Sequence, residues 1–114
     1  MRYLFLAYQD QLKWDSLSPD ERDTFDKACL ANDTTLRKSG HLLGTERLQP
    51  GHTTLTLRLA HGKLSLTDGS LVEAKEHLVG FFLIKARDLN EAIQVAAKMP
   101  QARTGAIEVR PLDK

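Results

Sequence analysis

The residue types best suited to acid–base chemistry gather in one short segment, where Asp68 is followed by Glu73, Lys75 and Glu76. A carboxylate whose pKa is raised by burial can take up a proton, and a neighbouring ammonium group steadies an anion. The same residues are also typical of a turn followed by solvated charge, because Asp68 and Gly69 form a common hairpin pair. The segment therefore predicts a proton-transfer site or a solvated turn, and both alternatives stay open.

Further candidates lie elsewhere in the chain. His41 opens a predicted strand, where an imidazole serves as an acid or base near neutral pH or is a satisfied strand-edge histidine. Tyr8 and Asp10 end the first predicted strand and suit a pocket rim, although packing explains them equally well. Arg110 suits an anionic ligand or a pairing with a nearby glutamate. The catalytic candidates are Asp68 and His41, and the ligand-binding candidates are Tyr8, Asp10, Glu73, Lys75, Glu76 and Arg110.

Metal and thiol chemistry find little support in the sequence. The four histidines include no pair with the helical spacing of His-Glu-x-x-His, so we expect neither a metal nor a cofactor. Cys29 is the single cysteine and is predicted to be a small core residue of a helix rather than a nucleophile. Asn32, near the same helix face, is a candidate buried polar group that needs hydrogen-bond partners.

The composition is that of an ordinary globular protein. With 114 residues, of which 41% are hydrophobic and 27% charged, the chain predicts a single domain over residues 1–114. A net charge of +1 argues against direct binding to nucleic acid. No apolar run approaches the roughly 20 residues that span a bilayer, and the first apolar stretch is too short for a signal peptide. We therefore expect a cytoplasmic protein without membrane contact.

The elements that must position these residues follow from periodicity and capping. Residues 2–8 predict a strand, and Ser18, Pro19 and Glu21 form the capping box of a helix over residues 19–39. Phe25, Cys29 and Leu36 recur along this helix at the spacing of one apolar face.

A second strand is expected over 41–48, followed by a hairpin turned at His61-Gly62. Its leucines alternate with polar residues, which predicts strands with one buried and one polar face; they are Leu55, Leu57, Leu59, Leu64 and Leu66.

The last three elements complete a known plan. Residues 79–84 predict a central strand, Asp88 and Glu91 a second capping box with its helix, and residues 105–110 a final strand. This order indicates an α+β fold, the ferredoxin-like βαββαβ plan with an extra β-hairpin strand, in which two helices cover one face of an antiparallel sheet. Apolar residues on both faces of the sheet indicate that a second copy covers the other face and encloses a pocket.

Several short stretches together resemble the YCII-related family, in its DGPF-domain branch of small bacterial proteins. They are Met1-Arg2-Tyr3-Leu4, Leu17-Ser18-Pro19, Ser39-Gly40, Asp68-Gly69 with Glu73, Lys75 and Glu76, Gly80-Phe81, Ala86-Arg87-Asp88-Leu89 and Val109-Arg110-Pro111-Leu112. The resemblance implies a dimeric α+β barrel with a pocket near the dimer-facing sheet. It also implies a His and Asp pair for acid–base work in the wider family, which has a relative similar to a dehydrochlorinase of chlorinated hydroxyquinols.

The departures from the family pattern are local. The branch's Asp-Gly-Pro-Phe is here Asp68-Gly69-Ser70-Leu71, and the first helix has no histidine, so the acid–base pair does not carry over directly. The sequence predicts a homodimer whose polar pocket binds a small aromatic or carboxylated metabolite and catalyses a cofactor-independent lyase or isomerase step. The alternative is a non-catalytic regulatory or interaction module, since the resemblance implies association with an extracytoplasmic-function sigma factor.

Overall fold

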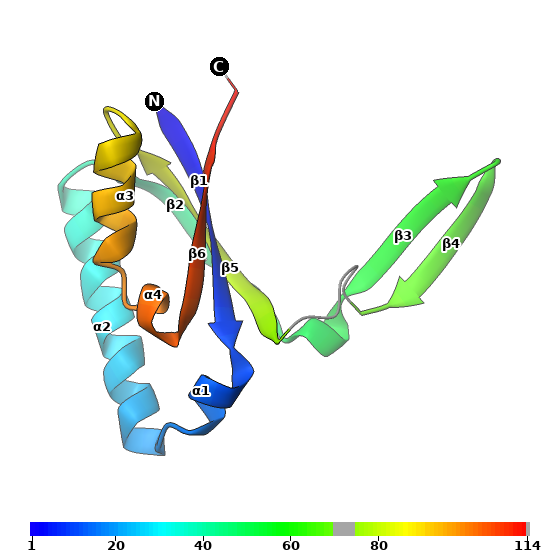
Figure 1. Cartoon of the computed structure of the whole chain (residues 1–114), viewed down its shortest axis with the longest axis horizontal. Helices are drawn as coiled ribbons and strands as arrows, with labels where there is room; N and C mark the ends of the chain where they lie inside the picture. The colour runs from blue at the N-terminus through cyan, green and yellow to red at the C-terminus, as the bar shows by residue number, and fades with distance from the viewer. Residues whose placement is uncertain (70–74, 114) are drawn as a thin grey trace.

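The body of the protein is a four-stranded antiparallel sheet in the order β2-β5-β1-β6, with helices along one side, as Figure 1 shows in the computed structural model. The structure describes residues 1–69 and 75–113. The elements are β1 (Arg2–Asp10), α1 (Gln11–Asp15), α2 (Pro19–Lys38), β2 (Leu42–Arg47), a 3₁₀ turn (Gly51–Thr53), β3 (Leu55–Ala60), β4 (Lys63–Asp68), β5 (Glu76–Lys85), α3 (Leu89–Ala97), α4 (Gln101–Thr104) and β6 (Gly105–Pro111).

The strand order confirms the predicted α+β, ferredoxin-like plan. β1 lies between β5 and β6, and β2 pairs with the outer side of β5, so the first and third strands of the body are central. The hairpin of β3 and β4 is inserted between β2 and β5 and forms a separate two-stranded sheet.

The core lies between the sheet and its helices. Alternate residues of β1, beginning with Tyr3 and Phe5, are buried on this side, opposite Ile84 and Phe82 of β5. The helices and their connections close the core with Leu36, Ala92, Val95, Ala96 and Met99. Side chains on the other parity, among them Leu4, Leu6, Phe81 and Leu83, are half-buried on the helix-free face.

The first predicted capping box is confirmed. Ser18 Oγ accepts a hydrogen bond from Glu21 N at 3.1 Å, and the Glu21 carboxylate accepts one from Ser18 N at 2.9 Å. The second box is only half formed. Asp88 accepts from Glu91 N at 2.9 Å, but the Glu91 carboxylate accepts from Arg87 N at 3.1 Å, because the Arg87 guanidinium also holds it at 2.6 Å.

The long helix buries less of its predicted apolar face than the sequence indicated. α2 ends one residue before the predicted boundary, and Leu36 is its single buried residue among those described, whereas Phe25 and Cys29 are half-buried. The short helices α1 and α4 were not predicted. α1 forms because the Asp10 side chain accepts hydrogen bonds from Leu12 N and Lys13 N at its start.

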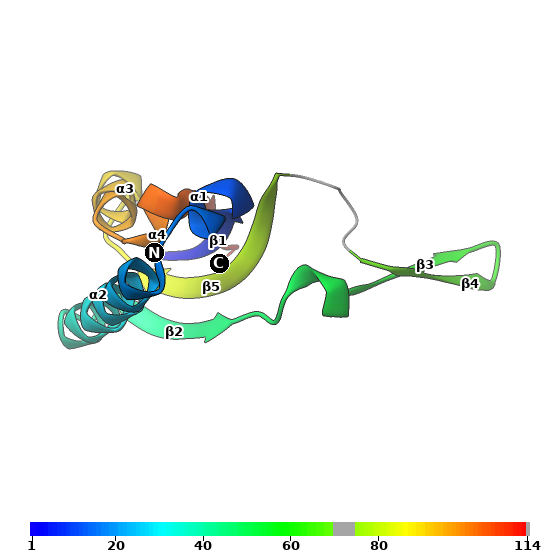
Figure 2. The ribbon, with the colours of Figure 1, turned by 90° about the horizontal axis from the view of Figure 1, so that it is seen from below.

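Residues 55–68 form an arm that projects from the body, as Figures 1 and 2 show. The predicted turn is confirmed, since His61 and Gly62 have φ of 52° and 74°, the left-handed conformations of a two-residue hairpin. The predicted burial of one face is wrong. The five leucines are 58–69% exposed, because the arm pairs only with itself within the described residues and no other element covers it.

Candidate functional site

A cleft of about 1140 Å³ lies between α1, α2 and the end of the sheet that leads to the arm. Trp14 and Phe25 line it from the two helices, and Tyr8 lines it from β1. Thr45, Arg47 and Phe82 contribute from β2 and β5, Gln101 and Thr104 from α4, and Asp68 with Gly69 from the base of the arm.

The sequence of α2 explains why the helix leaves this space open. Asp26, Cys29 and Asp33 follow one another at three- and four-residue spacing, so they share one helix face, and all three line the cleft. These side chains are polar or small and do not fill the space between helix and sheet. Leu36, one turn further on, is apolar and buried, and there the helix packs on the core.

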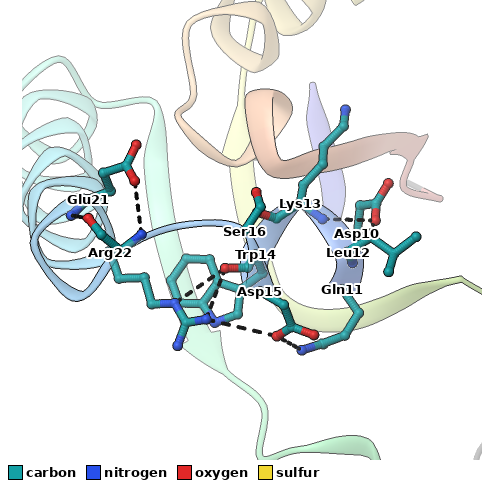
Figure 3. A network of polar contacts seen from close by, with 10 residues as sticks. Asp10, Gln11, Leu12, Lys13, Trp14, Asp15, Ser16, Glu21 and Arg22 are labelled. Atoms are coloured by element: carbon teal, nitrogen blue, oxygen red, sulfur yellow. Dashed lines mark hydrogen bonds and ion pairs between the residues drawn. The ribbon is translucent and has the colours of Figure 1, made fainter.

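Two aromatic rings form a wall of the cleft. Trp14 and Phe25 meet edge to face, with ring centroids 5.6 Å apart and planes at 72°. Arg22 secures the connection between α1 and α2. Its guanidinium lies 5.2 Å from the centroid of the Trp14 ring and donates to the Trp14 carbonyl at 3.0 and 3.3 Å, as seen in Figure 3.

Asp33 lines the cleft and lacks a hydrogen-bond partner for one of its carboxylate oxygens. Its Oδ1 atom is buried without a hydrogen-bond partner, and so are Gln101 Oε1 and Asn32 Nδ2. Burial raises the pKa of Asp33 above its usual 3.8, while Arg37 and Arg47 oppose the rise. A carboxyl group of raised pKa and an unpartnered amide oxygen in the lining of one cleft suit a ligand that supplies hydrogen-bond donors. The side chain of Asn32, predicted to be a buried polar group with hydrogen-bond partners, is half-buried, and its buried Nδ2 atom has no partner.

Cys29 is not set up as a nucleophile. Burial, together with the charges of Asp33 and Asp26, raises the pKa of the thiol from 9.0 to about 11, so the thiolate is scarce at neutral pH. Arg47 pairs with Asp26 across the cleft at 3.4 Å, which joins β2 to α2. Cys29 is therefore a small, half-buried residue in the lining of the cleft.

The candidate site residues predicted from the sequence lie in several separate parts of the structure. Tyr8 and Asp68 line the cleft. Asp10 caps α1, and Glu76 lies opposite it in the pairing of β1 with β5. Lys75 is exposed, and its carbonyl accepts from Gln11 N at 3.5 Å. Glu73 lies outside the described residues.

His41 and Asp68 are not brought together. His41 precedes β2 at the end of the sheet away from the arm, where its Nδ1 donates to the Lys85 carbonyl at 2.9 Å and lies 3.8 Å from Glu91 Oε1. Asp68 ends β4 at the base of the arm. Arg110 belongs to a third place, the helix-free face, where it binds Glu108 at 2.5 Å, and this contact raises the pKa of its guanidinium.

Asp33 and Gln101 were not among the residues proposed from the sequence. A signal for Asp33 exists, because it stands one helical turn after Cys29 on a face otherwise predicted to be apolar. Gln101 carries no comparable signal, since it follows Pro100 in a short helix that periodicity does not reveal.

Metal binding and membrane crossing can be judged for the described part of the chain. Over residues 1–69 and 75–113, His, Cys, Asp and Glu side chains form no group of three or more that could hold a metal ion. None of the helices described there combines the length and the apolar character that a membrane span needs.

Comparison with known proteins places the chain in a family. The model of the YCII-related domain matches residues 1–113. An uncharacterised protein of Rhizobium meliloti (strain 1021) is 34% identical over 114 residues, a match that covers 98% of this chain and 92% of that protein. The near-complete coverage by the family model, together with the order of strands and helices, shows that the chain belongs to the YCII-related domain family.

Proposed function

We propose that this protein binds a small metabolite in the cleft, with an aromatic ring against Trp14 and Phe25 and hydroxyl or amino groups directed to Asp33 and Gln101. The observation that carries the proposal is that the cleft lined by these rings is also lined by Asp33, whose Oδ1 is buried without a hydrogen-bond partner. A buried acceptor without a donor costs roughly 1–3 kcal/mol, which a ligand that donates to it offsets. The rings supply apolar contact area and an orienting surface.

Asp33 is also the group best suited to move a proton. Active-site carboxyls commonly have a raised pKa, because a general acid or base works best when its pKa lies near the working pH. The raised pKa of Asp33 therefore supports a cofactor-independent acid–base step, of the lyase or isomerase type, on the bound ring. Arg47 lies at the same cleft and suits a carboxylate on the ligand.

Trp14 provides the test of binding. It is the single tryptophan of the chain and lines the cleft, so its fluorescence reports on an occupant directly. We expect saturable quenching by members of a panel of phenols, catechols and aminobenzoates. Asp33→Asn should weaken the binding of compounds that bear donors by about tenfold or more, whereas Asp23→Asn, on the exposed side of the same helix, should leave it unchanged. Absence of saturable quenching across the panel contradicts the proposal.

The catalytic step has a separate test. Compounds that bind are incubated in deuterated water, and deuterium incorporation at carbon is followed by mass spectrometry. Incorporation that Asp33→Asn abolishes and Asp23→Asn preserves supports an acid–base enzyme. Binding without incorporation or turnover leaves a metabolite-binding protein.

A second function class, a non-catalytic regulatory or interaction module associated with an extracytoplasmic-function sigma factor, is favoured by one observation. The arm exposes five leucines on one face, and exposed apolar patches mark sites of association. Co-purification of a sigma factor with the wild-type chain, lost when residues 55–68 are replaced by a short glycine-serine linker, supports this alternative.

A further inference from the structure

The lining of the cleft is more acidic than the chain as a whole. The chain carries a net charge of +1, with 16 Lys and Arg residues against 15 Asp and Glu residues. In the described part of the chain, four carboxylates and one guanidinium line the cleft; they belong to Asp26, Asp33, Glu46 and Asp68, and to Arg47. With its histidines counted as neutral, the lining is therefore strongly negative.

The guanidinium of the lining is already paired. Arg47 Nη2 lies 3.4 Å from Asp26 Oδ1, and this ion pair joins β2 to α2. Within residues 1–69 and 75–113, no lysine or arginine forms an ion pair with Asp33, Glu46 or Asp68. In that part of the chain, the cleft thus offers a ligand three carboxylates without a cationic partner, whereas its guanidinium has an anionic partner.

The environment of Asp33 shows that the cations near the cleft do not balance its carboxylates. Arg37 and Arg47 both lower the pKa of Asp33, but burial outweighs them and leaves this pKa above 3.8. The buried Oδ1 atom of Asp33 has no hydrogen-bond donor among the described residues. A bound cation with an N–H group supplies both the charge and the donor, and such a charge-assisted hydrogen bond is roughly twice as strong as a neutral one.

The aromatic part of the lining suits the same kind of ligand. Trp14 and Phe25 form a wall of the cleft, and Tyr8 and Phe82 line it as well. The faces of aromatic rings attract cations, and the Arg22 guanidinium already lies 5.2 Å from the centroid of the Trp14 ring (Figure 3). Aromatic rings and carboxylates in one cleft favour an organic ammonium ion over an anion.

We propose that the ligand of the cleft is an aromatic amine, whose ring lies against Trp14 and Phe25 and whose ammonium group binds the carboxylate of Asp33. The inference rests on the proposed function and narrows its ligand to a cationic class. A carboxylate on the same ligand is compatible with it, because Arg47 releases Asp26 for the amine when it turns to that carboxylate. The negative lining also raises the local concentration of cations at the cleft.

Three compounds that share a phenol ring and differ in charge test the inference. The side chain ends in an ammonium group in tyramine, in a hydroxyl group in tyrosol and in a carboxylate in para-hydroxyphenylacetate. Isothermal titration calorimetry with the full chain measures their dissociation constants. We expect tyramine to bind about tenfold or more tightly than tyrosol, and para-hydroxyphenylacetate to bind most weakly. Added salt should weaken the binding of tyramine and leave that of tyrosol unchanged.

The results for the wild-type chain separate this inference from the proposed function. If tyrosol binds as tightly as tyramine, the assignment of a cationic ligand is overturned and the proposed function stands. If none of the three compounds binds, and no member of the panel of phenols, catechols and aminobenzoates binds either, both are overturned.

Variants of α2 identify the carboxylate that binds the amine. Asp33→Asn should reduce the preference for tyramine over tyrosol about tenfold, to near unity. Asp23→Asn removes the same charge from the exposed side of α2 and should preserve the preference. A preference that Asp33→Asn leaves unchanged overturns the role given to Asp33.

A gain of affinity provides a test that misfolding cannot imitate. The Arg47 side chain is 83% exposed, so Arg47→Gln removes its charge without opening the core and frees Asp26 for the ligand. We expect this variant to bind tyramine several-fold more tightly than the wild type and to bind tyrosol equally well. Weaker binding of tyramine by Arg47→Gln means that the guanidinium helps to hold the ligand, and it overturns the inference.

Discussion

Trp14 of α1 and Phe25 of α2 meet edge to face at 5.6 Å and form one wall of the cleft. Arg22 connects the same two helices, because its side chain lies against the indole ring and donates to the Trp14 carbonyl. The geometry of the cleft at this end therefore depends on the charged side chain of Arg22, which holds α1 and α2 together.

Replacing Arg22 by alanine should loosen this wall. The substitution removes a cation–π contact and two hydrogen bonds from a charged donor, and we expect a loss of about 1 kcal/mol in the free energy of unfolding. Urea titration followed by circular dichroism measures the loss, and a red shift of Trp14 emission reports the exposure of the ring. Lys27→Ala, which breaks only an exposed ion pair with Asp23, should change stability by less than about 0.5 kcal/mol. Equal effects of the two variants contradict the role given to Arg22.

Asp33→Asn should raise the melting temperature near neutral pH. The pKa of Asp33 is raised in the folded chain, mainly by burial, so its contribution to stability is fully present below pH 3.8 and is lost as pH rises through the folded pKa. Asparagine has no charge to desolvate, so the variant should gain a few degrees over the wild type at neutral pH. This difference should shrink as pH falls towards 3.8. A difference that is constant with pH, measured by differential scanning calorimetry, contradicts the raised pKa. Asp23→Asn is the matched control and should show no such gain.

Cys29 should react slowly with alkylating reagents in the folded protein. A pKa of about 11, against the usual 9.0, lowers the thiolate fraction at pH 8 roughly a hundredfold, and the thiolate is the reactive species. Alkylation by iodoacetamide, followed by intact mass, should be slower than in the urea-unfolded chain by at least this factor. The rate should continue to rise with pH beyond 9. Equal rates in the folded and unfolded chains contradict the raised thiol pKa.

The fold could be predicted from the sequence because its determinants are local. The capping box of Ser18 and Glu21 sets the start of α2, and the alternation of leucines with polar residues sets β3 and β4. The ferredoxin-like plan followed from the order of the predicted elements along the chain, and the observed sheet confirms it. The alternation could not show what lies against the leucines. A period of two residues indicates that one face of the strand pair is apolar, but it carries no information about the surface that covers this face.

The cleft was harder to predict, because it depends on distances between elements far apart in the chain. The spacing of Asp33 from Cys29 places both on one face of α2, but only the packing of Leu36 beyond them shows that the helix stays off the sheet there. Asp68 and His41 were grouped by their chemistry, but His41 lies beside Lys85 before β2, whereas Asp68 ends β4 in the arm. Residue types identified side chains that could do chemistry. Which of these side chains lie together depends on how the helices and strands pack.

A last prediction concerns the approach of β6 to β1, which brings α4 and Gln101 to the cleft. Gly105 pairs with Gln9, and a Cβ added there collides with the backbone carbonyl of Tyr8. Because backbone atoms of a central strand cannot move aside cheaply, Gly105→Ala should lower the free energy of unfolding by about 3 kcal/mol or more. Gly44→Ala is the matched control, since a Cβ at Gly44 meets no atom within 4 Å, and its effect should stay within about 0.5 kcal/mol. Chemical denaturation of both variants measures the difference. If they prove equally stable, β6 does not approach β1 as closely as the structure places it, and the position of Gln101 at the cleft loses its support.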